Sequence, residues 1–215
     1  MSSTSVNSDV ASTVRFCNGA RALARCFSVP GDDLDEVSAL CRQAAGTETD
    51  ELAEKMGNLA DLIAASERDL FAKSYAHLFL GPFEVLVPPY ASWFLDAEQR
   101  MMGPVAQAAA EAYAASGLGP ADGPRELPDH AAVELEFCYL LGYQGIEHGD
   151  DDALARLSAF WHSQMLPWLP KFAAAVKEHS DQPAFDALAE TLRALVALGP
   201  SEAASLAMKG LPDGT

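Results

Sequence analysis

The sequence predicts an all-α protein, a single-domain helical bundle of about eight to ten helices. Hydrophobic residues make up 49% of the 215 residues, enough for one sizeable core. Alanine is abundant whereas valine and isoleucine are scarce, which favours helices over strands. Apolar residues also recur every three or four positions along most of the chain. We expect one domain over residues 10–208, with flexible ends at 1–9 and 209–215.

Two helices are expected near the N-terminus. The first covers about residues 8–27, where Ser8 serves as the N-cap and apolar residues follow the helical period. The Val-Pro-Gly sequence at 29–31 ends this helix, because proline and glycine stop helices. Asp32 or Asp33 then caps a second helix that continues to about Ala45.

The next two helices are defined by a capping pattern and by buried faces. Thr47 and Asp50 have the spacing of a capping box and open a third helix. A fourth helix extends from about Glu67 to Leu80 and stops at a Gly-Pro pair. Apolar residues at helical spacing mark their buried faces: Leu52, Met56, Leu59, Leu62 and Ile63 in the third, and Leu70, Phe71, Leu78 and Phe79 in the fourth.

Proline and glycine divide the middle of the chain. The segment PFEVLVPPY at 82–90 is bounded by prolines, so we expect a packed extended loop rather than a strand of a sheet. Helix resumes over 91–116 with a break at Gly103-Pro104. The Gly- and Pro-rich connection at 117–128 is long enough for two copies to exchange helices. A monomer and a domain-swapped dimer therefore both stay open.

The C-terminal third predicts further helices. Residues 129–147 carry apolar side chains on more than one face, which is typical of a largely buried helix. Residues 150–178 are helical and are kinked or broken at Pro167 and Pro170. The last helices are expected at 183–198, with Pro183 in the first turn, and more briefly from Ser201.

The charge of the chain restricts its partners. The formal net charge is −17, from 31 acidic and 14 basic residues. Phosphate backbones and anionic lipid surfaces would be repelled, so we expect neither nucleic-acid binding nor stable membrane insertion. A cationic partner would be attracted, although an acidic surface that only keeps the protein soluble explains the same charge.

The cysteines and the N-terminus predict a cytoplasmic protein. Cys17, Cys26, Cys41 and Cys138 lack the spacing of a zinc site or of a secreted disulfide framework, so we expect four reduced thiols. No hydrophobic run approaches the length of a membrane span. The start MSSTSVNSDV has neither the basic nor the apolar part of a signal peptide.

A polar cluster stands out at Glu126-Leu127-Pro128-Asp129-His130, followed by Glu134. Asp129 is a natural N-cap for the helix that follows. His130 and Glu134 are four residues apart, so they share a helix face with apolar residues and must be paired or face a pocket. The alternative is a capped helix start whose histidine binds a neighbouring carbonyl group.

The sequence offers this cluster no catalytic partner. The nucleophile elbow GxSxG, the zinc motif HExxH, the phosphate loop GxxxxGK[ST] and the dinucleotide motif GxGxxG are all missing. We therefore expect no enzymatic activity, no metal and no cofactor. A helical enzyme or nucleotide-binding protein that uses His130 remains an alternative of another class.

An aromatic cluster extends from the fourth helix into the proline-rich loop and beyond it. Aromatic residues on a helix usually belong to the core, but here they continue through a loop, which can form an apolar groove for a peptide. The cluster consists of Tyr75, Leu78, Phe79, Phe83, Pro88, Pro89, Tyr90, Trp93 and Phe94.

Together these motifs resemble the TorD/DmsD family of redox-enzyme maturation chaperones. The stretch YAHLFLGPFEVLVPPYASWFLD at 75–96 is similar to one hallmark segment of the family. The residues ELPDH at 126–130 resemble a shortened form of the second hallmark, Glu-x-Pro-x-Asp-His. A weaker similarity covers Trp161-His162 and Leu166-Pro167-Trp168, so that the resemblance spans residues 75–172.

The resemblance implies a cytoplasmic chaperone with an all-helical TorD/DmsD-like fold and no catalysis. Its partner would be the twin-arginine signal peptide, and the precursor, of a molybdopterin-containing reductase subunit, whose export would wait for cofactor insertion. The implied peptide-binding residues are Tyr75, Leu78, Phe79, Phe83, Pro89, Tyr90, Ser92, Glu126, Asp129, His130 and Glu134.

The physical chemistry of a twin-arginine leader suits these residues. We expect Asp129, with Glu126 or Glu134, to pair with the arginines, His130 to orient Asp129 or to bind a peptide carbonyl, and the aromatic residues to take the hydrophobic stretch. Relatives often carry tryptophan where this chain has Tyr75, Phe83 and Tyr90, which suggests a different client. Two further alternatives stay open: a nitrate-reductase-type assembly chaperone whose client subunit is not exported, and a helical scaffold without a groove.

Overall fold

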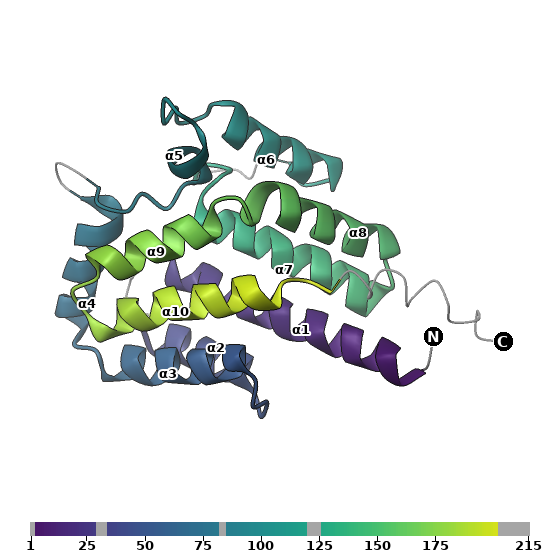
Figure 1. Cartoon of the computed structure of the whole chain (residues 1–215), viewed down its shortest axis with the longest axis horizontal. Coiled ribbons are helices and arrows are strands. Elements are labelled where there is room, and N and C mark those ends of the chain that lie inside the picture. Colours follow the sequence, from purple (N-terminus) through teal and green to yellow (C-terminus); the bar gives the residue numbers. More distant parts are fainter. Residues whose placement is uncertain (1–2, 29–33, 82–84, 120–125, 202–215) are drawn as a thin grey trace.

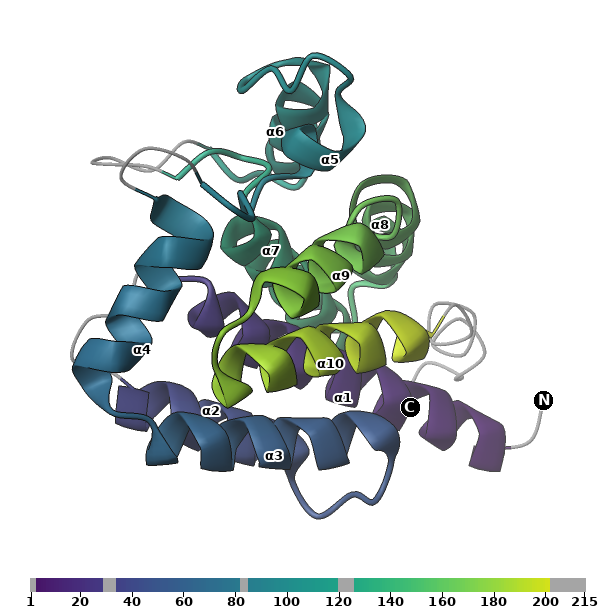
Figure 2. The ribbon, with the colours of Figure 1, turned by 60° about the vertical axis from the view of Figure 1, so that its left-hand side comes forward.

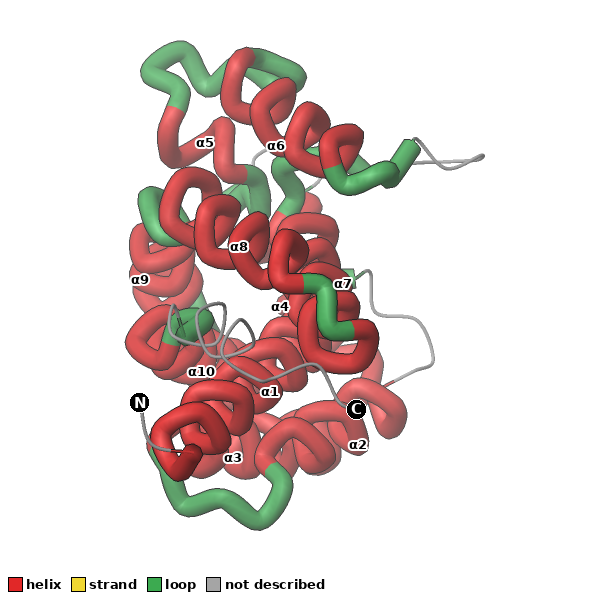
Figure 3. Tube along the Cα trace, turned by 90° about the vertical axis from the view of Figure 1, so that its right-hand side faces the viewer, coloured by secondary structure: helices red, strands yellow, loops and turns green. Residues whose placement is uncertain are grey.

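Helices form nearly all the regular structure in the residues that the computed structural model describes, 3–28, 34–81, 85–119 and 126–201 (Figures 1 and 3). No sheet occurs in these residues, and a single antiparallel bridge joins Tyr90 to His130. The all-α prediction is confirmed. The α-helices are α1 (Ser3–Cys26), α2 (Leu34–Ala45), α3 (Glu51–Ala65), α4 (Arg68–Tyr75), α5 (Ala91–Leu95), α6 (Pro104–Ala115), α7 (Ala131–His148), α8 (Asp151–Phe160), α9 (Leu169–His179) and α10 (Pro183–Leu198).

The bundle is arranged around α1, which contacts α2, α7 and α10. The antiparallel pair α2 and α3 forms one end of the molecule, whereas α5 and α6 lie at the opposite end (Figures 1 and 2). Two π-helical turns, Ala76–Leu80 and Trp161–Met165, continue α4 and α8. The large side chains of α1 and the second π-helical turn meet in the core, where the rings of Phe16 and Trp161 pack edge to face at 4.8 Å.

Several helix boundaries differ from the predicted ones. The first helix begins at Ser3 rather than near Ser8, so most of the expected flexible N-terminus is helical. The third helix begins after Asp50, whose carboxylate accepts a hydrogen bond from Ala53 N, and Thr47 is therefore not its cap. The helix expected from Ser201 and the flexible C-terminus lie outside the described residues.

The middle of the chain departs further from the expected pattern. The helix predicted over 91–116 consists of the short α5 and of α6, separated by the irregular residues 96–103. Pro104 starts α6, as expected of a residue without an N–H group. The described part of the segment before α5, residues 85–90, is a packed loop, as predicted: Val87, Pro88 and Pro89 are buried, and Val87 N donates to Leu78 O at 2.8 Å.

Two glycines allow close packing around α7. A Cβ atom on Gly142 would lie 2.0 Å from Cys17 Sγ of α1, and one on Gly145 would lie 2.4 Å from the side chain of Leu154 on α8. Real atoms do not approach so closely, so neither position accepts a larger residue unless its neighbours move. Burial also raises the pKa of the Cys17 thiol to about 12, which makes it an inert part of this contact.

We expect Gly145→Ala to lower the free energy of unfolding by about 1–2 kcal/mol. Overpacking against Leu154 costs on the order of 1–3 kcal/mol, and the better helix propensity of alanine returns up to about 1 kcal/mol. Gly57 of α3 is the matched control, because a Cβ atom there meets no atom within 4 Å. Urea unfolding should show Gly57→Ala to be neutral or stabilising, and equal effects of the two substitutions would contradict this account.

Candidate functional site

The two sequence hallmarks meet through their backbones. Ala91 N donates to Asp129 O at 2.9 Å, and Ala131 N donates to Pro89 O at 2.8 Å. These two bonds form the isolated bridge between Tyr90 and His130, although nearly forty residues separate the two segments in the sequence. The start of α5 is thereby fixed to the start of α7. We call this arrangement, residues 89–92 together with 126–131, the motif junction.

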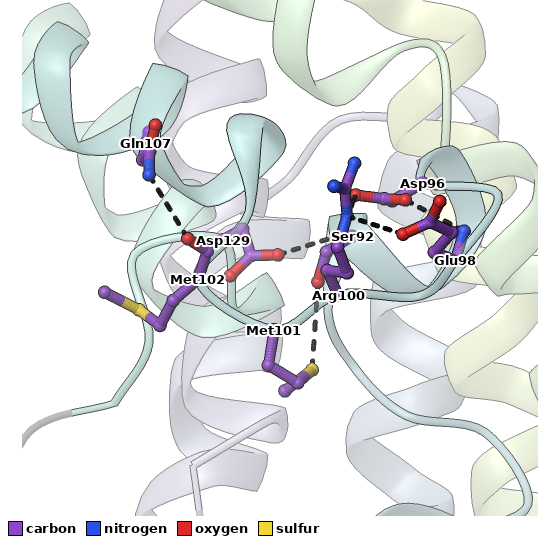
Figure 4. Close-up of polar contacts among 8 residues, drawn as sticks. All are labelled: Ser92, Asp96, Glu98, Arg100, Met101, Met102, Gln107 and Asp129. Atoms are coloured by element: carbon purple, nitrogen blue, oxygen red, sulfur yellow. Dashed lines mark hydrogen bonds and ion pairs between the residues drawn. The ribbon is translucent and has the colours of Figure 1, made fainter.

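Asp129 holds the junction together from inside. Its side chain is 0% exposed, and its Oδ2 accepts a hydrogen bond from Ser92 N at 2.9 Å (Figure 4). Asp129 therefore provides an acceptor for a backbone N–H group in the first turn of α5, where an acidic group also complements the helix dipole. We predicted Asp129 as the cap of the helix that follows it, and that prediction is wrong: His130 caps α7, accepting from Ala132 N through Nδ1 at 3.2 Å.

His130 is a neutral, buried part of the junction. Burial lowers its pKa, while the nearby charges of Glu126 and Asp129 act in the opposite direction. Because Nδ1 accepts the hydrogen bond from Ala132, the proton of the neutral ring is on Nε2. The ring packs edge to face against Tyr90, with 5.1 Å between ring centroids.

Glu134 is a buried acid one helical turn beyond the junction. Its Oε2 accepts a hydrogen bond from Trp168 Nε1 at 2.9 Å, and its side chain is 0% exposed. Burial raises the pKa of Glu134 to about 8, and the charge of Asp129 raises it further against the effect of the Trp168 bond. Glu134 is therefore mostly protonated at neutral pH. Asp129 Oδ1 and Glu134 Oε1 are both buried and have no hydrogen-bond partner among the described residues.

Trp168 connects this acid to α5. The indole ring stacks on Phe94 of α5 at 5.8 Å and packs against Phe172 of α9 at 5.3 Å. Trp168 was not among the predicted site residues. The Leu-Pro-Trp similarity at 166–168 pointed to it, but the sequence alone gives no sign that it binds Glu134.

The outer part of the junction consists of Tyr90 and Glu126. Glu126 is exposed, and its Oε1 accepts a hydrogen bond from Tyr90 Oη at 2.9 Å. Burial and this hydrogen bond raise the pKa of Tyr90, so the phenol remains a donor at all physiological pH values. The junction thus exposes the carboxylate of Glu126, which the hydroxyl group of Tyr90 holds in place.

Three of the predicted peptide-binding residues lie inside the core instead. Tyr75, Leu78 and Phe79 are at most 2% exposed. Tyr75 Oη donates to Phe27 O at 2.8 Å, and the ring of Phe79 packs against Phe27 at 5.7 Å. A peptide on the surface cannot reach them in this conformation. Phe83 lies outside the described residues.

The predicted site residues are thus only partly brought together. Pro89, Tyr90, Ser92, Glu126, Asp129 and His130 form the junction, with Glu134 one turn deeper, whereas Tyr75, Leu78 and Phe79 lie in the core.

Ser92 is not arranged as a nucleophile. Its N–H group, not its hydroxyl, meets Asp129, and its Oγ lies 3.9 Å from Met101 Sδ. In the described part of the chain no group of three or more His, Cys, Asp or Glu residues is placed to hold a metal ion. Nor does any helix there combine the length and apolar character needed to cross a membrane.

Comparison with known proteins identifies relatives that match the chain over most of its central part. A family model described as the nitrate reductase delta subunit matches residues 46–174. The chaperone protein TorD of Psychrobacter sp. is 33% identical over 116 residues, which cover 53% of this chain and 52% of that protein. The Tat proofreading chaperone DmsD of Salmonella typhi is 26% identical over 145 residues, 67% of this chain and 68% of DmsD. The chain thus aligns with about half the length of this TorD and about two thirds of DmsD.

A solved structure of a related protein has a similar fold. The crystal structure described as a redox enzyme maturation protein from Archaeoglobus fulgidus superposes with a TM-score of 0.59 at 25% identity. The superposition covers 83% of this chain and 91% of the other, so the fold is TorD-like over most of its length. The chain therefore belongs to the nitrate reductase delta subunit family, the family of the TorD and DmsD chaperones that its two hallmark motifs resemble.

Proposed function

We propose that this protein is a cytoplasmic chaperone that binds the twin-arginine leader of a molybdopterin-containing reductase subunit and keeps the precursor from export until its cofactor is inserted. One observation carries the proposal: the two hallmark motifs form a single structure, the motif junction, which exposes a carboxylate next to an aromatic ring. The relatives support the same role, because one is named a TorD chaperone and another a Tat proofreading chaperone.

The outer and inner residues of the site have different roles in this proposal. Glu126 is exposed and oriented by Tyr90, so it is the carboxylate that pairs with a leader arginine. Asp129 and Glu134 are fully buried and shape the site from below. Asp129 fixes α5, and Glu134 fixes Trp168, on which Phe94 of α5 stacks. The net charge of −17 raises the rate at which a cationic leader arrives.

Calorimetric titration with a panel of twin-arginine leaders tests the function. Each leader is paired with a copy in which both arginines are glutamine. We expect at least one leader to bind with a dissociation constant in the micromolar range or below, and its copy to bind more weakly, with a difference that shrinks at high salt. A folded protein that binds no leader would overturn the proposal.

We expect Glu126→Gln to weaken leader binding about three- to tenfold. The substitution removes one carboxylate from a partly exposed ion pair, whose energy is modest. Glu51→Gln is the matched control: it changes the net charge equally, but Glu51 is exposed on α3, at the other end of the molecule from α5 (Figure 1). Equal losses for the two variants would show that only overall charge matters and that Glu126 has no specific contact.

A second candidate follows from the family model, which is described as the nitrate reductase delta subunit. In that case the client is a reductase subunit without an exportable leader. The same titrations separate the two, because such a chaperone binds the folded or partly folded subunit and ignores every leader of the panel.

A further inference from the structure

The leader has a hydrophobic stretch beside its arginines, and the core position of Tyr75, Leu78 and Phe79 removes them as its surface partners. Among the described residues, another apolar surface is then needed for this stretch if the proposed function holds. Large hydrophobic side chains that are exposed in the described residues occur at Leu70, Leu80, Trp93, Met101, Met102, Leu118, Tyr143 and Leu166.

Two of these residues are adjacent and lie next to the motif junction. Met101 and Met102 are 45% and 54% exposed, and both belong to the turn between α5 and α6. Met101 Sδ lies 3.9 Å from Ser92 Oγ, and Ser92 N in turn binds Asp129 (Figure 4). Met101 is thus separated from Asp129 by a single residue, Ser92, and Met102 follows it in the same turn.

The backbone of this turn is held firmly. Asp96 accepts hydrogen bonds from Glu98 N at 2.9 Å and from Arg100 Nε at 3.1 Å, and its pKa is lowered chiefly by the bond from Glu98. Gln107 Nε2 donates to Met102 O at 3.4 Å (Figure 4). A Cβ atom on Gly103 would lie 3.0 Å from Arg100 O, so any larger residue there would crowd the turn.

The turn also stores conformational strain. Among the described non-glycine residues, only Gln99 and Met102 have positive φ angles, 51° and 60°. Side chains other than glycine disfavour this region, and such residues persist where the surrounding contacts enforce them, often at binding sites. Met102, one of these two residues, is also 54% exposed.

Methionine suits a surface that must accept varied apolar sequences. Its side chain is unbranched and its sulfur polarisable, so it adapts to differently shaped partners on a fixed backbone. Within the turn, Asp96 and Glu98 both pair with Arg100, whereas Glu126 of the neighbouring junction is an exposed carboxylate that accepts a hydrogen bond from Tyr90. A partner that is apolar and flanked by positive charge complements both properties.

We propose that Met101 and Met102 form the surface that binds the hydrophobic stretch of the client's leader, while Glu126 binds its arginines. This inference rests on the proposed function and names the apolar half of the same site. The rigid turn sets the position of the stretch, and the two flexible thioethers fit its side chains.

The double variant Met101→Gln/Met102→Gln tests the proposal. Glutamine preserves side-chain length and removes the apolar, polarisable end, and both positions are exposed, so stability should hardly change. We expect affinity for the leader that binds wild-type protein to fall tenfold or more. Leu70→Gln is the matched control, because Leu70 is 53% exposed on α4, away from the turn, and should leave the affinity within about twofold of wild type.

A second leader peptide tests whether the two methionines contact the hydrophobic stretch rather than the arginines. When its hydrophobic stretch is replaced by polar residues and its arginines are kept, wild type and the double variant should bind it equally weakly. Wild-type affinity of the double variant for the intact leader overturns the inference and leaves the proposed function standing. Absence of leader binding to wild-type protein overturns the proposed function itself, so the two failures are distinguishable.

Discussion

Glu134→Gln is expected to raise the stability of the protein at pH 8 by several kcal/mol and to remove a loss of stability that the wild type suffers as pH rises. Glu134 titrates near its usual value of 4.5 in the unfolded chain but only near pH 8 in the folded protein. Between these values the folded state holds a proton that the unfolded state has released, so stability falls with pH. The full difference is on the order of 4–5 kcal/mol, complete above about pH 8 and absent below about pH 4.5.

Glutamine imitates the protonated acid. Its carbonyl oxygen can accept the hydrogen bond from Trp168 Nε1, and its amide group takes the place of the buried Oε1. Urea unfolding of wild type and variant from pH 5 to pH 9 measures the effect. Glu136→Gln is the control, because Glu136 is exposed on the same helix. Parallel stability curves for wild type and Glu134→Gln would contradict the assigned protonation.

Asp129→Ala is expected to destabilise the protein by about 2–4 kcal/mol and to abolish leader binding. Asp129→Asn, in contrast, should keep both the stability and the leader affinity of the wild type nearly unchanged. Alanine leaves the buried Ser92 N–H group without an acceptor and loses the cap of α5. Asparagine retains an acceptor oxygen at the same position. Its removal of charge also lowers the pKa of Glu134, because the charge of Asp129 raises that pKa.

The asparagine variant decides whether Asp129 positions α5 or binds arginine. If it only positions α5, leader affinity should change by less than about threefold while the unfolding free energy stays within about 1 kcal/mol of wild type. A tenfold weaker affinity in a fully stable Asp129→Asn variant would instead show that the carboxylate contacts the leader directly. That result would require the junction to open on binding, because Asp129 is completely buried in the free protein.

Local patterns were sufficient to predict much of this fold. The last helix in the described residues has the predicted bounds, from Pro183 to Leu198, because a proline in the first turn and a glycine after the end are local signals. The family resemblance at 75–96 and 126–130 also pointed to two segments that lie together in the structure. The packed loop before Tyr90 followed from its prolines.

Tertiary contacts determined what the sequence could not predict. Asp129 has the local pattern of a cap for the helix that follows it, yet it caps α5. The backbone bonds of the junction, which join two distant segments of the chain, place Ser92 N within its reach. Helical spacing placed Phe79 on an apolar face but could not distinguish a groove from the core. No motif marks Met101 and Met102, which we propose as part of the binding surface because both are exposed and Met102 has a positive φ angle.

The bridge between Tyr90 and His130 has a consequence for the evolution of the family. Its two bonds join main-chain atoms, so they do not depend on which side chains occupy those positions. They also bring together the two ends of the segment that carries α5 and α6. Changes within this segment that preserve the Phe94–Trp168 contact would therefore leave its attachment to the bundle in place. On the proposed function, relatives that bind different clients would then be expected to differ in this segment more than in the helices of the bundle.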